Sequence, residues 1–258
     1  MNGRWRLALL ALAALLLAPL IWSVASALPP FGAPEAAYGP AVNALLPGAR
    51  NVSNMVAAVN FDVRGIDTLG EESMLLCAVV GAVVLLRGRR GEDRGDRAGR
   101  VPGRPIVERD DATILACRIA ALLVLLFGAY VALHGTVTPG GGFQGGAIAA
   151  SGLLLVYPGE DYSCWRALVP GTVLTVIEGA GALIFVLAAA LPLAGGHAAL
   201  ANILPLGTWK DLYSGGVMVV VNFAVALAVV GGFGLLLIEF MEETRAPEED
   251  PVPDEEDR

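Results

Sequence analysis

An acidic residue inside a long apolar run is the sharpest candidate for chemistry in this sequence. Glu178 lies ten residues into the run 168–191, between Ile177 and Gly179. A charge near the middle of a bilayer is costly, so this carboxyl group is expected to face protein or water. Two roles fit it equally: a group that takes up and releases protons, or a neutral residue whose hydrogen bond holds two helices together.

Two other polar side chains belong to apolar runs. His134 directly follows the run 112–133 and fits either a proton relay, because imidazole exchanges protons near neutral pH, or an ordinary cap at the membrane surface. Asn222 lies within the run 214–240 and needs a hydrogen-bond partner there. A neighbouring helix is the expected partner, and an ion is the alternative.

A second polar cluster, Asp62, Asp67 and Glu71, surrounds the start of the run 66–86. Apolar positions 52, 55, 56, 59 and 63 recur at helical spacing, which predicts a short amphipathic helix over 51–63. Asp62 is expected to pair with Arg64 or with other neighbours. Thr68 and Glu71 fit a capping box that opens the following helix, and a gate to an ion path is the alternative role for Glu71.

A glycine-rich loop separates two of the apolar runs. It contains Thr138, Pro139, Gly140, Gly141, Gly142, Phe143, Gln144, Gly145 and Gly146. Lipid cannot satisfy the backbone groups that such residues free, so protein or a wet cavity must cover the loop. Pro139 is expected to end the preceding helix, and the glycines to let another backbone approach closely. This packing role is favoured over an ion site in which Gln144 and freed carbonyl groups line a hydrated path.

The composition is that of an integral membrane protein. Hydrophobic residues make up 55% of the 258 positions and charged residues 16%, against about 25% charged in soluble domains. No basic face suggests nucleic acid as a partner, and the glycine loop lacks the Lys-Ser/Thr pair of a nucleotide-binding loop. Cys77, Cys117 and Cys164 share no metal spacing, so the sequence predicts neither a metal nor a cofactor.

Six apolar runs predict an all-α, polytopic protein of about six spans, with a glycine-rich break before the fourth. The runs are 7–28, 66–86, 112–133, 144–157, 168–191 and 214–240. The first run is longer than a usual signal-peptide core and is interpreted as a retained span, although small residues at 24–27 offer a cleavage site. Apolar and polar positions do not alternate as they do in membrane β-barrels.

The distribution of basic residues predicts that both termini are cytoplasmic. The inner segments then hold Arg4, Arg6, eight arginines between 87 and 109, Arg166, Arg245 and Arg258, and the outer segments hold Arg50, Arg64 and Lys210. In this topology the glycine loop begins at the outer face. Residues 1–88 form a two-span unit, 89–110 an Arg-rich cytoplasmic linker, 111–240 a four-span domain and 241–258 an acidic, disordered tail.

Two motifs resemble one family of membrane complexes. His134-Gly135, together with residues 138–147, resembles the hallmark of the B subunit of Mrp-type (Mnh-type) multisubunit sodium/proton antiporters, a likeness that extends over roughly 111–240. Residues 62–71 resemble the C-terminal membrane segment of the large A subunit of these complexes, and the equivalent small E subunit of membrane-bound hydrogenases. The chain therefore resembles a joining of two neighbouring pieces of one assembly.

The resemblance implies a transporter subunit, not an enzyme. It would work in the cell membrane with other subunits of a cation/proton antiporter related to the membrane arm of respiratory complex I, exchanging Na+ for H+. Glu178 matches the acidic residue in the third span of the B subunit, and Asn222 falls in its Asn-containing last span. The lysine that the resemblance leads us to expect a few residues after Asn222 is absent, because 223–230 is entirely apolar.

Two other functions remain alternatives at this point. The first is a subunit of a redox-driven membrane complex, such as a hydrogenase, that couples electron transfer to ion movement. The second is a structural adaptor whose polar residues only hold helices together. The candidates for an ion or proton path are Glu178, His134, Gln144, Asn222, Asp62, Asp67 and Glu71.

Overall fold

The computed structural model describes residues 3–28, 38–92, 110–160 and 162–243, and every regular element in these ranges is a helix. The predicted all-α class is confirmed. Most of the predicted linker at 89–110 and nearly all of the predicted tail at 241–258 lie outside the described residues. Contacts divide the chain into two compact units, Met1–Asn43 and Ala44–Arg258, while the predicted division at the Arg-rich segment stays a prediction.

The first unit contains α1 (Gly3–Ser26), a helix with Pro19 inside it and an apolar stretch over Ala11–Ser26. Helix α2 (Tyr38–Arg50) crosses the boundary between the units and buries Leu46. All elements described below belong to the second unit.

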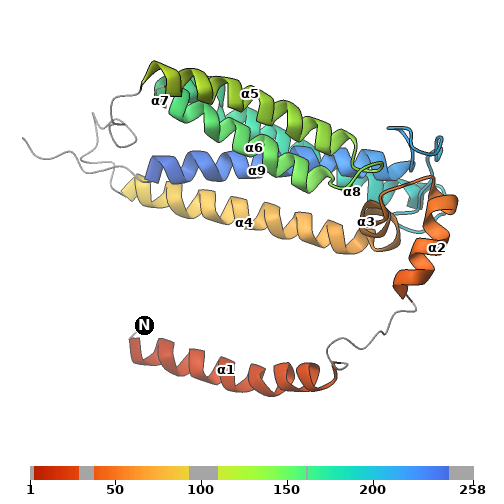
Figure 1. Ribbon diagram of the computed structural model, residues 1–258. Helices are drawn as coiled ribbons and strands as arrows, with labels where there is room; N and C mark the ends of the chain where they lie inside the picture. The colour runs from red at the N-terminus through yellow and green to blue at the C-terminus, as the bar shows by residue number, and fades with distance from the viewer. Residues whose placement is uncertain (1–2, 29–37, 93–109, 161, 244–258) are drawn as a thin grey trace, which may run out of the picture. The chain divides into compact units, whose positions relative to one another are not determined.

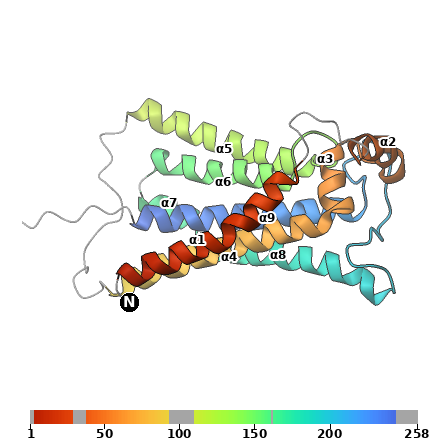
Figure 2. The ribbon, with the colours of Figure 1, turned by 90° about the horizontal axis from the view of Figure 1, so that it is seen from below.

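Helix α9 (Val217–Glu243) is the centre of the second unit (Figure 1). It packs against α8 (Gly171–Ala194) on one side and α6 (Gly142–Gly159) on the other, and α5 (Asp111–Leu133) packs on α6. The four helices follow one another in a row in Figure 2, and α4 (Gly65–Glu92) contacts both α9 and α8. Of the apolar stretch of α9, 61% is buried, against 11% for α4 and for α5, so α9 forms the core.

The short helix α7 (Tyr162–Leu168) links α6 to α8 and anchors one end of this row. Its Trp165 is fully buried, and the indole N–H donates a hydrogen bond of 2.8 Å to the carbonyl of Leu153. Arg166 of α7 pairs with Glu242 of α9 at 3.2 Å. The connection therefore holds the ends of α6, α8 and α9 together.

Glycines bring the helix backbones into direct contact. A Cβ added at Gly145 of α6 would lie 2.6 Å from the backbone nitrogen of Ala132 and from the carbonyl oxygen of Gly128, both at or near the end of α5. Helices α8 and α9 meet in the same way, since a Cβ at Gly231 would lie 2.5 Å from the backbone nitrogen of Glu178. Close packing of this kind replaces the hydrophobic effect as the main attraction between helices in lipid.

Four helical stretches in the described ranges are long and apolar enough to cross a membrane: Gly65–Leu86, Asp111–Leu133, Trp165–Ala194 and Val217–Glu242. The chain is therefore a multi-pass membrane protein, while the predicted number of about six spans is not confirmed. The two remaining predicted runs correspond to the shorter apolar stretch Ala11–Ser26 and to the glycine-rich α6. The orientation of the termini also stays a prediction.

Two local expectations are wrong. Pro139 does not end α5, which stops at Leu133 because the next residues form a turn in which Val137 and Thr138 donate backbone hydrogen bonds to the carbonyl of His134. Thr68 does not cap α4, which already begins at Gly65. The Thr68 hydroxyl donates instead to the carbonyl of Asn60, at 2.7 Å, and ties α4 to the preceding segment.

That preceding segment is helical, as the spacing of its apolar residues predicts, but shorter and less regular than 51–63. It consists of α3 (Met55–Ala58), capped by Asn54, and the π-helical turn η1 (Val59–Val63). A π-helical turn widens the helix by one residue and is frequent at functional sites. Ala57, Ala58 and Phe61 are buried, so one face of the segment packs against the helix row.

Candidate functional site

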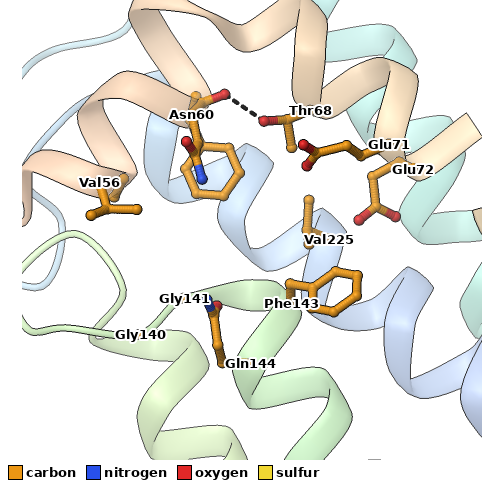
Figure 3. Close-up of a pocket in the computed structure, with 12 residues that line it drawn as sticks. Val56, Asn60, Thr68, Glu71, Glu72, Gly140, Gly141, Phe143, Gln144 and Val225 are labelled. Carbon is orange, nitrogen blue, oxygen red and sulfur yellow. Dashed lines mark hydrogen bonds between the residues drawn. The ribbon is translucent and has the colours of Figure 1, made fainter. Parts of the chain in front are cut away.

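A cavity of about 350 Å³ lies where α4, α6 and α9 meet below the turn η1 (Figure 3). Its walls come from four parts of the chain. They are formed by Val56, Ala57, Asn60 and Phe61 of α3 and η1, Thr68, Glu71 and Glu72 of α4, Gly140, Gly141, Phe143 and Gln144 of the glycine loop and α6, and Val225 of α9. Polar groups thus gather in a space otherwise walled by apolar residues.

Glu72 is the buried acid of this cavity. It is 6% exposed, and among the described residues its Oε2 atom has no hydrogen-bond partner. Thr68 lies one turn earlier on the same face of α4, and Glu71 lies beside it at the exposed mouth. Gln144 of α6 lines the opposite wall (Figure 3). Because burying a carboxyl group without a partner is costly, the position suits a group that binds a proton or a cation.

A second buried acid, Glu178, lies further along the line where α4 packs on α9, which is called the seam below. It is 4% exposed, and its Oε1 atom has no hydrogen-bond partner in the described ranges. A Cβ added at Gly232 of α9 would lie 3.0 Å from this oxygen and 3.1 Å from Val79 of α4, so α4, α8 and α9 meet at Glu178. Val79 follows Glu72 by two helical turns, about 10 Å along α4. The two acids therefore lie at successive levels of one seam.

Asn222 fixes the glycine loop from the side of α9. Its side-chain oxygen accepts a hydrogen bond of 2.6 Å from the backbone nitrogen of Gly142, and its side-chain nitrogen donates one of 2.5 Å to the carbonyl of Ala132. A Cβ at Gly135 would lie 2.6 Å from the same side-chain oxygen. With both ends of its amide occupied by backbone, Asn222 acts as the helix-to-loop connection that the sequence favours over an ion ligand.

Asn54 fixes the loop from the opposite side. Its side-chain nitrogen lies within hydrogen-bond distance of three loop carbonyls, those of Gly135 at 2.7 Å, Thr138 at 2.9 Å and Gly140 at 3.2 Å. Its side-chain oxygen accepts from the backbone of Val56 and Ala57 and so caps α3. Gly140 has a φ of +125°, which an L side chain rarely adopts, and this conformation turns its carbonyl toward Asn54. One amide thus joins the segment before α4 to the loop before α6.

Replacing Asn54 with alanine is expected to lower the free energy of unfolding by about 3 kcal/mol. The substitution removes a helix cap, worth about 1 kcal/mol, and leaves buried carbonyl groups without a donor, at about 1–3 kcal/mol. Asn54→Asp keeps the cap but sets a buried carboxylate oxygen against the three carbonyl oxygens, so it should be at least as unstable as the alanine variant. Thermal unfolding in detergent measures the effect. Thr175→Ala is the control, because that hydroxyl is exposed and bonds only within α8; equal midpoints for both alanine variants would contradict the role of Asn54.

The structure does not bring every predicted residue into the cavity. His134 caps the end of α5, where its Nδ1 atom lies 2.9 Å from the carbonyl of Tyr130 and its ring packs on the Tyr130 ring at 4.0 Å. Asp62 pairs with Arg50 at 2.6 Å and lines a separate cavity of about 590 Å³. Asp67 pairs with Arg64 at 2.5 Å. Glu71 and Gln144 line the cavity, whereas Glu178 and Asn222 lie outside its lining.

Glu72 and Asn54 were not singled out from the sequence. A signal for Glu72 exists, because positions 65, 68, 72 and 79 of α4 are all buried and recur at helical spacing. Glu72 therefore belongs to the buried face that begins at Gly65, whereas Glu71 points to the exposed side. No local pattern indicates the role of Asn54, whose partners lie more than eighty residues away.

The fold and these groups define a multi-pass α-helical membrane protein with the buried acids Glu72 and Glu178 along one helix seam. Residues 113–235 match the family model described as a domain related to the MnhB subunit of Na+/H+ antiporter. The resemblance to the B subunit is thereby confirmed.

Curated relatives share this region. The uncharacterized protein MJ1307 of Methanocaldococcus jannaschii is 29% identical over 203 residues, which cover 70% of this chain and 74% of that protein. The B subunit of the Na(+)/H(+) antiporter of Bacillus subtilis is 34% identical over 79 residues, 27% of this chain and 55% of that subunit. The corresponding B subunit of Alkalihalophilus pseudofirmus is 33% identical over 76 residues, which cover 26% of this chain and 53% of that subunit. The matches thus span about half the length of the two antiporter subunits.

Two solved structures share the fold. A chain of the membrane-bound sulfane sulfur reductase, an archaeal respiratory membrane complex, has a TM-score of 0.68 and 24% identity, covering 91% of this chain and 98% of that chain. A chain of the Mrp complex from Dietzia sp. DQ12-45-1b has a TM-score of 0.68 and 22% identity, covering 96% of this chain and 27% of that chain.

Proposed function

We propose that this protein is a membrane subunit of a multisubunit antiporter that exchanges a monovalent cation, Na+, for protons, driven by the proton gradient. The match of residues 113–235 to the MnhB-related family and the antiporter subunits among its relatives support this proposal. The observation that carries it is the pair of buried acids, Glu72 and Glu178, each with an oxygen that lacks a partner among the described residues.

The two acids and the cavity form part of the ion path in this proposal. Glu71 and Gln144 line the open side of the cavity, and Glu72 lies inside it. Glu178 is the next acid along the seam, near the contact of Val79 with Gly232. Ionisable residues in membrane helices are costly and commonly mark such paths, which face the bundle interior or water. Asn54 and Asn222 hold the glycine loop as a wall, while other subunits of the complex supply the remainder of the path.

The experiment is exchange by the intact complex carrying Glu178→Gln, reconstituted in vesicles, with Na+ efflux measured against a pH gradient. Glutamine keeps the size of the side chain and removes its ability to ionise. We expect at least about a tenfold loss, since groups that transfer protons commonly contribute 10²-fold or more. Glu160→Gln is the matched control, because Glu160 pairs with Arg118 away from the seam. Unchanged exchange by an assembled Glu178→Gln complex would contradict a role for Glu178 in the ion path.

A subunit of a redox-driven membrane complex is the second candidate. The observation that favours it is the fold shared with one chain of the sulfane sulfur reductase complex. The shared part covers 98% of that chain. The proteins that co-purify in mild detergent distinguish the two functions. Partners that contain iron–sulfur clusters, detected by iron content and electron paramagnetic resonance, would support the redox-driven complex and contradict the antiporter.

A further inference from the structure

The cavity and a second hollow follow one another along α6 and α9, and together they are called the groove. Beyond Phe143, which packs edge-to-face on Phe233 with ring centres 6.0 Å apart, lies an apolar hollow of about 280 Å³. It is lined on the α6 side by Ala147, Ala150, Ser151 and Leu154 and on the α9 side by Phe233, Leu236, Leu237 and Phe240. From Gln144 to Leu154 the groove follows ten residues of α6, about 15 Å.

The upper end of this groove is unsuited to lipid. Glu71, Gln144 and Asn60 are exposed side chains at the mouth of the cavity, and behind them lies the unpartnered Oε2 atom of Glu72, which is 6% exposed. The described lining residues include two acids and no basic residue. In hydrocarbon, these groups require a cation and hydrogen-bond donors from elsewhere.

We propose that a membrane-spanning helix of a partner subunit lies in this groove and carries a lysine or arginine that reaches Glu71 and Glu72. The inference rests on the proposed function, because it requires a complex with other subunits. The small residues Ala147 and Ser151, one turn apart on α6, allow a second helix to approach closely. The acidic upper end selects the charge of the partner, and the apolar lower end packs its remaining turns.

Helix α1 of this chain does not carry a basic residue at the position that the groove requires. The basic residues of α1 are Arg4 and Arg6, both in its first turn, and the following twenty residues are uncharged. Leu154 lies about 10–15 Å along α6 from the cavity. A helix that fills the groove must therefore carry its basic side chain at the same distance from the turns that contact Leu154. This requirement describes an apolar span with one basic residue two or three turns from the contact.

The test places the photo-crosslinking amino acid benzoylphenylalanine at Ala147 or at Leu154 in the complete complex, with Val176 on the exposed face of α8 as the control position. We expect Ala147 and Leu154 to cross-link to one apolar segment of another subunit that contains a lysine or arginine. Val176 is expected to cross-link elsewhere. A segment without a basic residue, a segment of this chain's own α1, or lipid alone would each overturn the proposal.

A second measurement tests the charge. The combined substitution Glu71→Gln and Glu72→Gln should lower the cross-link yield from Ala147 by about tenfold, because removing one partner of a buried ion pair weakens it strongly. Glu160→Gln should leave the yield unchanged. An unchanged yield in the double variant would overturn the charged contact. If other antiporter subunits co-purify while the groove cross-links only to lipid, this inference fails and the proposed function stands; if none co-purify, the proposed function fails.

Discussion

Replacing Gly145 with leucine is expected to prevent α5 and α6 from packing. A Cβ at this position would meet the backbone nitrogen of Ala132 and the carbonyl oxygen of Gly128 at 2.6 Å each. Both are rigid backbone atoms, so the helices must separate to accommodate any side chain. Overpacking of this kind costs about 3 kcal/mol or more for a large side chain, a large share of the roughly 5–15 kcal/mol by which a protein is stable.

The chain contains a matched control for this substitution. Gly179 lies inside α8, and a Cβ added there would meet nothing within 4 Å, so Gly179→Leu should fold normally. Gly145→Ala should give an intermediate loss. The measurement is the yield of monodisperse protein in mild detergent, together with its thermal midpoint. A Gly145→Leu protein as stable as Gly179→Leu would mean that α5 and α6 are not held in backbone contact.

The helices were predictable because a membrane span depends on the hydrophobicity of its own residues. Long apolar runs must form helices in lipid, where backbone groups have no other partner. The predicted runs 112–133 and 214–240 accordingly match α5 (Asp111–Leu133) and α9 (Val217–Glu243) within three residues at each end. The ends that were wrong depend on contacts from outside the run. The turn after His134 ends α5 without Pro139, and the bond from Thr68 to Asn60 lies inside α4 and does not cap it.

The residues of the candidate site were predictable only where a polar residue stands among apolar neighbours in the sequence of one helix. Glu178 stands out because its neighbours in sequence are apolar, and it is buried. Glu71 stands out equally by sequence, yet the structure buries Glu72 and leaves Glu71 exposed, since adjacent residues of a helix point about 100° apart. The choice between them is made by the packing of α4 on α9. The link through Asn54 was not predictable, because it joins residues 54 and 140, which no local spacing relates.

Glu72→Gln is expected to abolish most of the exchange of Na+ for protons by the intact complex. Glutamine fits the space of the buried carboxyl group but neither ionises nor takes up and releases a proton. A path that uses Glu72 therefore loses one of its binding groups. At least about a tenfold loss is expected, by the reasoning that applies to Glu178. The control is Ser73→Ala, the next residue of α4, whose exposed hydroxyl bonds only to the carbonyl of Leu69 within the same helix.

The double variant Glu72→Gln with Glu178→Gln decides whether the two acids serve one path. If ions or protons pass Glu72 and Glu178 in series, blocking either stops the same flux. The double variant should then be no slower than the slower single variant, because the effects of residues that act as a unit are not additive. Two independent paths would instead multiply the two losses. Multiplied losses, measured in complexes that retain their subunits, would contradict a single seam from the cavity past Val79 and Gly232 to Glu178.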